Sequence, residues 1–237
     1  MMEEYKKNRV RRGVMLGVLF ALIPLTLAVG VRLFADKQYH LISIITALLS
    51  CVPFFLRFER GKSGAREMVV LAVMTAFSVI GRLIFTPIPG FKPVSAITII
   101  AGIALGPEAG FMVGSLSAIV SNLFFGQGPW TPFQMFVWGL IGFLSGWIFY
   151  HKKKPNKLIL SMVGVLGGVL FSLLMDIWTT LSVDGSFLWS RYLTCVVSSF
   201  PFMATYAVSN VIFLLILTEP FLEKLNRIKV KYGIFGG

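Results

Sequence analysis

Charged residues are scarce in this sequence. Only 14% of its 237 residues are Asp, Glu, Lys or Arg, whereas a soluble domain carries about 25%. Hydrophobic residues make up 56% of the chain. Because a surface this poor in charge cannot be solvated by water, the composition excludes an ordinary soluble domain and indicates lipid as the solvent.

Residues that commonly carry chemistry are also few. Cys51 and Cys195 both lie inside apolar runs and match no metal-binding or redox spacing. His40 and His151 are the only histidines, and HExxH and GxSxG are absent. Gly61-Lys62-Ser63 matches the end of a P-loop, but Leu56 stands where that motif requires a glycine. The sequence therefore predicts no catalytic residue, no metal site, no cofactor and no enzyme activity.

The net charge of +12 does not indicate nucleic-acid binding, because the basic residues form short clusters between apolar runs and no basic face. The apolar runs predict eight helices. We expect them at 14–34, 41–56, 67–85, 93–105, 108–125, 132–150, 158–181 and 192–218. The run at 93–105 is too short to cross a bilayer directly, and Gly106-Pro107-Glu108 predicts a tight break before the next helix.

Basic clusters also predict the orientation. They precede the first helix (Lys6 to Arg12), separate helices two and three (Arg57 to Arg66), separate helices six and seven (Lys152 to Lys157) and end the chain (Lys224 to Lys231). With eight helices all four clusters fall on one side, which the positive-inside rule assigns to the cytoplasm. We expect a multi-pass protein of the cell membrane with both termini in the cytoplasm.

Small residues at a spacing of four share one helix face and allow a close approach by another backbone. Ala72 and Ala76 have this spacing, and so do Gly110 and Gly114. The pattern alone leaves two interpretations open, which are packing within the chain and contact with a partner protein.

Polar residues within apolar runs mark sites or pairs, because they are costly in lipid. Arg82 and Asp176 either form an ion pair or face a ligand cavity, and Asn210 is interpreted as an interhelical contact. Short outer segments rich in Pro and Gly, at 86–92 and 126–131, are flanked by aromatic residues. These aromatics form either the usual interfacial belt or the rim of a site for an organic ligand.

Several of these stretches together resemble a known family. They are the alanine pair, the run Ala101 to Gly110 (AGIALGPEAG), the segment Phe125 to Pro132 (FGQGPWTP) and Trp138 to Gly142 (WGLIG). On these residues the chain resembles the substrate-binding (S) components of energy-coupling factor (ECF) vitamin transporters. The resemblance covers residues 67–218 and implies a six-helix core that captures a micronutrient at the extracellular side.

The resemblance also implies partners and sites. The core would dock on a membrane coupling subunit that carries two cytoplasmic ATPases, through Ala72 and Ala76, with Gly110 and Gly114 also assigned to this contact. The ligand would lie beneath the loops at 86–92, 126–131 and 182–190. The expected ligand-binding residues are Arg82, Phe91, Lys92, Asn122, Gln127, Trp130, Gln134, Trp138, Asp176, Trp178 and Arg191.

Two further helices distinguish this chain from a six-helix core. We therefore expect a two-helix membrane hairpin at residues 1–66, the substrate-binding core at 67–218 and a basic cytoplasmic tail at 219–237. The subgroup that it resembles most is the one assigned to cobalamin or its precursors. Two alternatives are a lipid-modifying membrane enzyme that uses Asp176 and Arg82, and a non-catalytic scaffold.

Overall fold

The computed structural model describes residues 13–14, 16–34, 45–46, 48–49, 64–150, 155–184 and 187–235. Within these ranges it has seven α-helices, one π-helical turn and no strand. Five of these helices are long and apolar enough to cross a membrane. They are α4 (Gly64–Ile84), α6 (Pro107–Phe125), α7 (Trp130–Phe149), α8 (Lys157–Asp184) and α9 (Trp189–Tyr232). The prediction of an all-helical, multi-span membrane protein is confirmed.

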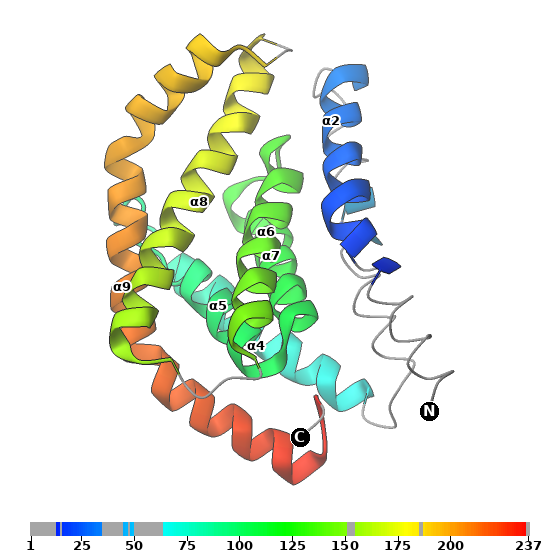
Figure 1. The fold of residues 1–237 in the computed structure, drawn as a ribbon, viewed down its shortest axis with the longest axis vertical. Coiled ribbons are helices and arrows are strands. Elements are labelled where there is room, and N and C mark those ends of the chain that lie inside the picture. The colour runs from blue at the N-terminus through cyan, green and yellow to red at the C-terminus, as the bar shows by residue number, and fades with distance from the viewer. Residues whose placement is uncertain are drawn as a thin grey trace.

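Helix α5 (Val94–Leu105) is the short helix that the sequence predicted, and every one of its residues is buried. It lies inside the bundle and contacts α6, α7 and α9 (Figure 1). Gly106 ends it with a φ of 107°, a conformation that strongly favours glycine, and Pro107 starts α6 at once. The predicted break between the two helices is therefore confirmed.

Glycines allow a close contact between α6 and α7. A Cβ atom at Gly110 would lie 2.5 Å from the carbonyl oxygen of Gly142, and one at Gly114 would overlap the backbone of Trp138. Both glycines of α6 are buried. This corrects the expectation that Gly110 and Gly114 contact the coupling subunit, because their faces are already covered by α7.

Helix α9 is much longer than predicted. The sequence predicted an end at Thr218, but the helix continues through Pro220 to Tyr232. Figure 1 shows it changing direction along its length, so that its last part turns across the lower end of the bundle. Prolines at 201 and 220 lie inside the helix, and prolines are a common cause of such bends. The expected tail at 219–237 thus begins as a continuation of the last membrane helix.

The first apolar run forms the π-helical turn η1 (Val18–Leu22) and α2 (Ile23–Phe34). Its side chains Leu19 and Ile23 are fully buried in a small cluster with Phe111 and Phe143. This helical segment therefore packs on α6 and α7. Most of the expected second helix, at 41–56, lies outside the described residues, as do the basic clusters at 6–12, 57–62 and 152–154.

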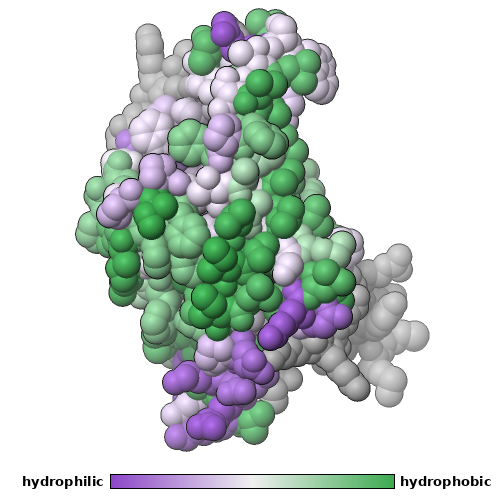
Figure 2. Space-filling view, turned by 90° about the vertical axis from the view of Figure 1, so that its left-hand side faces the viewer, coloured by the Kyte–Doolittle hydropathy of each residue, from purple (hydrophilic) through white to green (hydrophobic). Residues whose placement is uncertain are grey.

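The surface matches the composition. Figure 2 shows a broad apolar band over the middle of one face, with hydrophilic side chains gathered at the lower end. In Figure 1 that end holds the last part of α9. This part carries the exposed cations Lys224, Arg227 and Lys231. An apolar band next to a basic end is the distribution expected of a chain in a lipid bilayer.

Candidate functional site

A buried arginine lies at the centre of the candidate site. Arg82 occupies the last turn of α4, and only 6% of its surface is exposed. Its Nη1 donates hydrogen bonds to Ser121 Oγ and, over 2.8 Å, to Asn122 Oδ1. Within the described residues no carboxylate pairs with it. A buried guanidinium held only by neutral acceptors leaves a positive potential in this part of the bundle.

Asn122 extends this network to α7. It lies on the last turns of α6 and is fully buried, and its Nδ2 donates to Thr131 Oγ1 over 2.8 Å and to Gln134 Oε1 over 2.9 Å. Thr131 Oγ1 also accepts a bond from the backbone N–H of Gly128, which closes the loop before α7. We call Arg82, Ser121, Asn122, Thr131 and Gln134 the arginine cluster. Three helices converge on it.

Aromatic rings cover the arginine cluster. The guanidinium carbon of Arg82 lies 4.5 Å from the ring centroid of Phe125 and 5.2 Å from that of Trp138. Trp138 in turn stacks on Phe171 of α8, with centroids 5.2 Å apart, and Phe171 contacts Tyr206 of α9 at 5.0 Å. This aromatic row connects α7, α8 and α9, and its rings Trp138 and Phe171 are both buried inside the bundle.

Two buried donors near the cluster have no acceptor in the described part of the chain. They are Nε of Arg82 and Nε1 of Trp138, whose side chain is only 2% exposed. Because buried polar atoms in native structures are almost always hydrogen-bonded, such donors require an explanation. Acceptor atoms from a bound molecule, such as carbonyl oxygens or ring nitrogens, would satisfy them.

Lys92 brings a second cation towards Arg82 from the loop between α4 and α5. Its backbone N–H donates to Ser209 Oγ over 2.8 Å, and Ser209 Oγ donates back to the Lys92 carbonyl over 2.9 Å. These bonds attach the loop to the middle of α9. Burial lowers the pKa of the Lys92 ammonium below its ordinary value, and the positive charge of Arg82 lowers it further.

Asp176 of α8 is a buried carboxylate that does not belong to the arginine cluster. Only 7% of its surface is exposed, and its Oδ2 accepts a hydrogen bond of 2.6 Å from Ser199 of α9. No ion pair joins Asp176 to Arg82, since the structure gives each of these two described residues different partners. The sequence left open an ion pair or a ligand cavity that both residues face. The structure does not have the ion pair, and the role of both residues in ligand binding stays a prediction.

Trp130 and Trp178 meet at the end of the bundle where α7 begins. Their ring centroids are 6.0 Å apart in an edge-on arrangement, and Trp178 also contacts Phe133 at 6.5 Å. Nε1 of Trp178 is buried without a partner among the described residues. This tryptophan pair lies beside the cluster that holds η1 and α2, so the N-terminal helix borders this side of the candidate site.

Three expected ligand-binding residues have other surroundings. Phe91 packs against Phe85 and Phe213, with centroids 5.6 and 5.1 Å away. Gln127 donates its side-chain amide to the carbonyl of Ile119 over 2.9 Å and so holds the loop after α6. Arg191 is exposed on the first turn of α9. The loop expected at 182–190 is helical up to Asp184, and residues 185–186 lie outside the described ranges.

Sequence reasoning missed part of the network. Ser121 was detectable, because it precedes Asn122 and lies four residues after Ser117 on the same face of α6. Thr131 belongs to the outer segment already singled out. Phe171, Tyr206 and Ser199 gave no signal, since a ring or hydroxyl within an apolar run has no periodicity of its own.

The described residues contain no group of three or more His, Cys, Asp or Glu side chains arranged to hold a metal ion. The chemistry that the arrangement offers is recognition. It combines two neighbouring cations, amide and indole donors, and stacked rings.

The chain is similar to a protein family and to individual curated proteins. A model of the family "ECF-type riboflavin transporter, S component" matches residues 62–227, from the start of α4 almost to the end of α9. A UPF0397 protein of Vibrio atlanticus (strain LGP32) is 32% identical over 99 residues, which cover 40% of this chain and 53% of the relative. A UPF0397 protein of Aliivibrio fischeri (strain MJ11) is 33% identical over 87 residues, 35% of this chain and 47% of the relative.

The matched region thus spans about half the length of these curated relatives. No solved structure matches the chain. The family match covers well over half of the 237 residues and includes all five candidate membrane spans. The chain therefore belongs to the family of ECF-type riboflavin transporter S components, which are transport subunits and not enzymes.

Proposed function

We propose that this protein captures a vitamin at the extracellular side of the membrane and delivers it to an ATP-driven ECF importer. The family match over residues 62–227 carries this proposal. Riboflavin is the first candidate ligand, because the family is described by it. Its flat ring system has carbonyl oxygens and ring nitrogens, so it offers the acceptors that buried donors at the site lack.

The proposed binding site is the arginine cluster together with the aromatic row. Arg82, Gln134 and Trp138 would supply hydrogen bonds, and the ring of Trp138 would also provide a stacking surface. Lys92, Asp176, Trp130 and Trp178 would border the ligand. Phe91, Asn122 and Gln127 would act indirectly by holding the loops and the arginine, and Arg191 would lie at the entrance.

The proposed mechanism requires partners. The chain would dock on a membrane coupling subunit associated with two cytoplasmic ATPases and would reorient while docked, driven by ATP hydrolysis in those partners. Support comes from α4, where Ala72 and Ala76 are exposed on one face and so are open to another backbone. We propose that both termini are cytoplasmic and that residues 1–66 form an accessory hairpin on the core at 67–218.

Cobalamin or one of its precursors is the finer expectation that the sequence suggested, and it stays a prediction. The two ligands are distinguished by titrating the purified full chain in detergent, without nucleotide, with riboflavin and cobalamin in parallel. We expect saturable riboflavin binding, with quenching of flavin fluorescence by the neighbouring indole rings. Saturation by cobalamin alone would move the chain to the other subgroup, and binding of no vitamin by well-folded protein would contradict the proposed function.

A further inference from the structure

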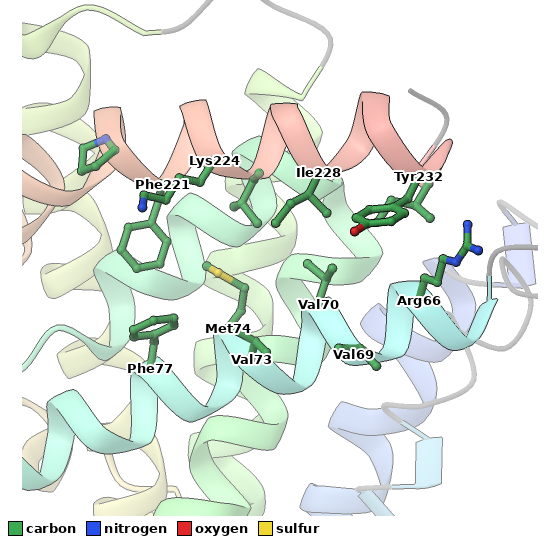
Figure 3. A pocket seen from close by; sticks show the side chains of 13 residues that line it. Arg66, Val69, Val70, Val73, Met74, Phe77, Phe221, Lys224, Ile228 and Tyr232 are labelled. Carbon is green, nitrogen blue, oxygen red and sulfur yellow. The ribbon is translucent and has the colours of Figure 1, made fainter.

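A groove of about 560 Å³ lies between α4 and the last part of α9, away from the proposed vitamin site. Figure 3 shows the two helices running side by side with their apolar side chains turned toward the space between them. Val70, Val73 and Met74 line it from α4, and Leu225 and Ile228 line it from α9. Phe77 and Phe221 meet at one end with centroids 5.4 Å apart, so a ring pair bounds the groove there.

The opposite end of the groove is positively charged. Arg66 and Tyr232 line it, and the guanidinium carbon of Arg66 lies 5.4 Å from the ring centroid of Tyr232. The ammonium of Lys231 lies 5.3 Å from the same centroid. Glu67 is the acidic neighbour on α4, but its carboxylate accepts the backbone N–H of Phe235 over 2.6 Å. Arg66, which lines the groove, and Lys231, which lies next to it on the far side of the lining, thus place two positive charges around the Tyr232 ring, and this favours an anion there.

The second wall of the groove has the character of a helix at a membrane surface. After Pro220, α9 buries Leu222 and Leu225 while Lys224 and Arg227 stay exposed. A helix with apolar residues on one face and basic residues on the other is typical of segments that lie at the boundary of lipid and water. Figure 1 shows this part turning across the lower end of the bundle instead of continuing along it.

We propose that the groove is a binding site for an anionic phospholipid. An acyl chain would lie along the apolar floor, which extends about 12 Å from Val69 to Phe77 at ~1.5 Å per residue. The phosphate would bind Arg66 and Lys231 beside Tyr232. This site goes beyond vitamin capture, because it needs neither the vitamin nor the coupling subunit.

Charge favours a lipid over a protein helix as the occupant. The groove joins an apolar trough to cationic side chains, with Arg66 at the Tyr232 end and Lys224 beside Phe221, and none of the residues that line it is acidic (Figure 3). A phospholipid with a negative headgroup combines the complementary parts, an apolar chain and an anion. Because Ala72 and Ala76 lie on the neighbouring face of α4, the bound lipid would border the proposed contact with the coupling subunit.

Native mass spectrometry of the full chain tests this site. Detergent-purified protein is mixed with equal amounts of dioleoyl phosphatidylglycerol and dioleoyl phosphatidylcholine, which share their acyl chains. We expect one phosphatidylglycerol to be retained in clear preference. In the double variant Arg66→Gln/Lys231→Gln, the fraction of protein that retains phosphatidylglycerol should fall at least tenfold. The matched double variant Arg227→Gln/Lys157→Gln removes the same charge outside the groove and should retain the lipid.

A second variant tests the trough itself. Val73→Trp fills the groove from a half-exposed position and should remove phosphatidylglycerol, whereas Val197→Trp, on an exposed face of α9, should not. Equal retention of the two lipids, or equal loss in both double variants, would overturn the proposal. So would a Val73→Trp protein that keeps its lipid but no longer captures the coupling subunit, because the groove would then accept a partner helix. Riboflavin titration of the same variants reports separately on the proposed function.

Discussion

Arg82 is the residue on which the proposed binding site depends most. Its Nη1 already holds Ser121 and Asn122, while its Nε has no acceptor among the described residues. A buried cation without a carboxylate is costly, so its retention at this position favours a role in binding. The two neutral partners fix its orientation and leave part of its hydrogen-bonding capacity for a ligand.

We therefore expect Arg82→Gln to weaken riboflavin binding at least tenfold, which corresponds to about 1.4 kcal/mol of binding free energy. Fluorescence titration of the purified variant measures this. Arg227→Gln removes an exposed cation of α9 and serves as the matched control, with unchanged affinity expected. If folded Arg82→Gln protein binds riboflavin with the same affinity as the wild type, Arg82 does not contact the ligand.

Lys92 leads to a prediction about pH. Its pKa is lowered by burial and by Arg82, so the folded protein binds fewer protons at this position than the unfolded chain. Between the lowered value and the ordinary pKa of about 10.4, the free energy of unfolding must then rise with pH. Lys92→Gln lacks this contribution. Comparing the two proteins cancels the other titrating groups.

We expect the melting temperature of the wild type, relative to Lys92→Gln, to increase as the pH rises towards the ordinary lysine pKa of about 10.4. Thermal unfolding in detergent at a series of pH values up to that pKa provides the measurement. A difference that stays constant with pH would show that Lys92 is solvated in the folded protein, and one that falls with rising pH would show that folding raises the pKa of Lys92 instead.

Single residues also show how far sequence reasoning reaches. Arg82, Asn122 and Gln134 were identifiable because polar groups in apolar runs are conspicuous, and the structure brings them together. Gln127 was expected at the ligand through the family resemblance, but its side chain holds its own loop. Phe171 and Tyr206 were invisible, because their importance comes from their distance to Trp138 and not from any local pattern.

At the scale of elements, the contact between α6 and α7 depends on the absence of side chains. Gly110 and Gly142 face each other so closely that a methyl group on either would meet backbone atoms. Backbone atoms cannot move aside as the end of a flexible side chain can. The helices would have to separate, which would also disturb the buried network at Asn122 and Gln134.

Gly110→Ala should accordingly destabilise the protein by about 1–3 kcal/mol, the usual range for overpacking. The expected readout is a lower melting temperature in detergent. Gly17→Ala is the control, because a Cβ atom there meets nothing within 4 Å and the residue is helical. If both variants have the melting temperature of the wild type, α6 and α7 leave room for a methyl group at Gly110, which contradicts the close contact.

Helix α4 carries the proposed contact with the coupling subunit. We expect Ala72→Trp combined with Ala76→Trp to abolish vitamin uptake by cells while leaving vitamin binding to the purified chain intact, because both side chains are exposed. Leu166→Trp on the exposed surface of α8 should affect neither. Uptake that survives the double substitution would place docking on another face.

Element boundaries were predictable where local chemistry decides them. Gly106 and Pro107 fix the break after α5, since one residue takes a left-handed φ and the next has no N–H to satisfy. The end of the last helix was not predictable from the apolar run at 192–218. A proline suggests a helix end, but Leu222 and Leu225 find buried positions in the tertiary structure, and that packing continues α9 to Tyr232.

At the scale of the whole molecule, the helices form a bundle with a polar site at one end of α4, α6 and α7. The basic and partly amphipathic end of α9 lies beside the first turns of α4. Membership of the S-component family is consistent with a site built for recognition, because a transport subunit binds its substrate without breaking any bond. The described residues between 64 and 235 contain the arginine cluster and the aromatic row on which the proposed capture depends.

The most direct test of vitamin capture is mass spectrometry of the small molecule that co-purifies with the full chain, expressed without its coupling partners and without added nucleotide. Capture predicts a vitamin, riboflavin first, in near-stoichiometric amount, and loss of that molecule from Arg82→Gln but not from Arg227→Gln. A folded, monodisperse protein that retains no vitamin, and binds none when a broad vitamin panel is added, would contradict it.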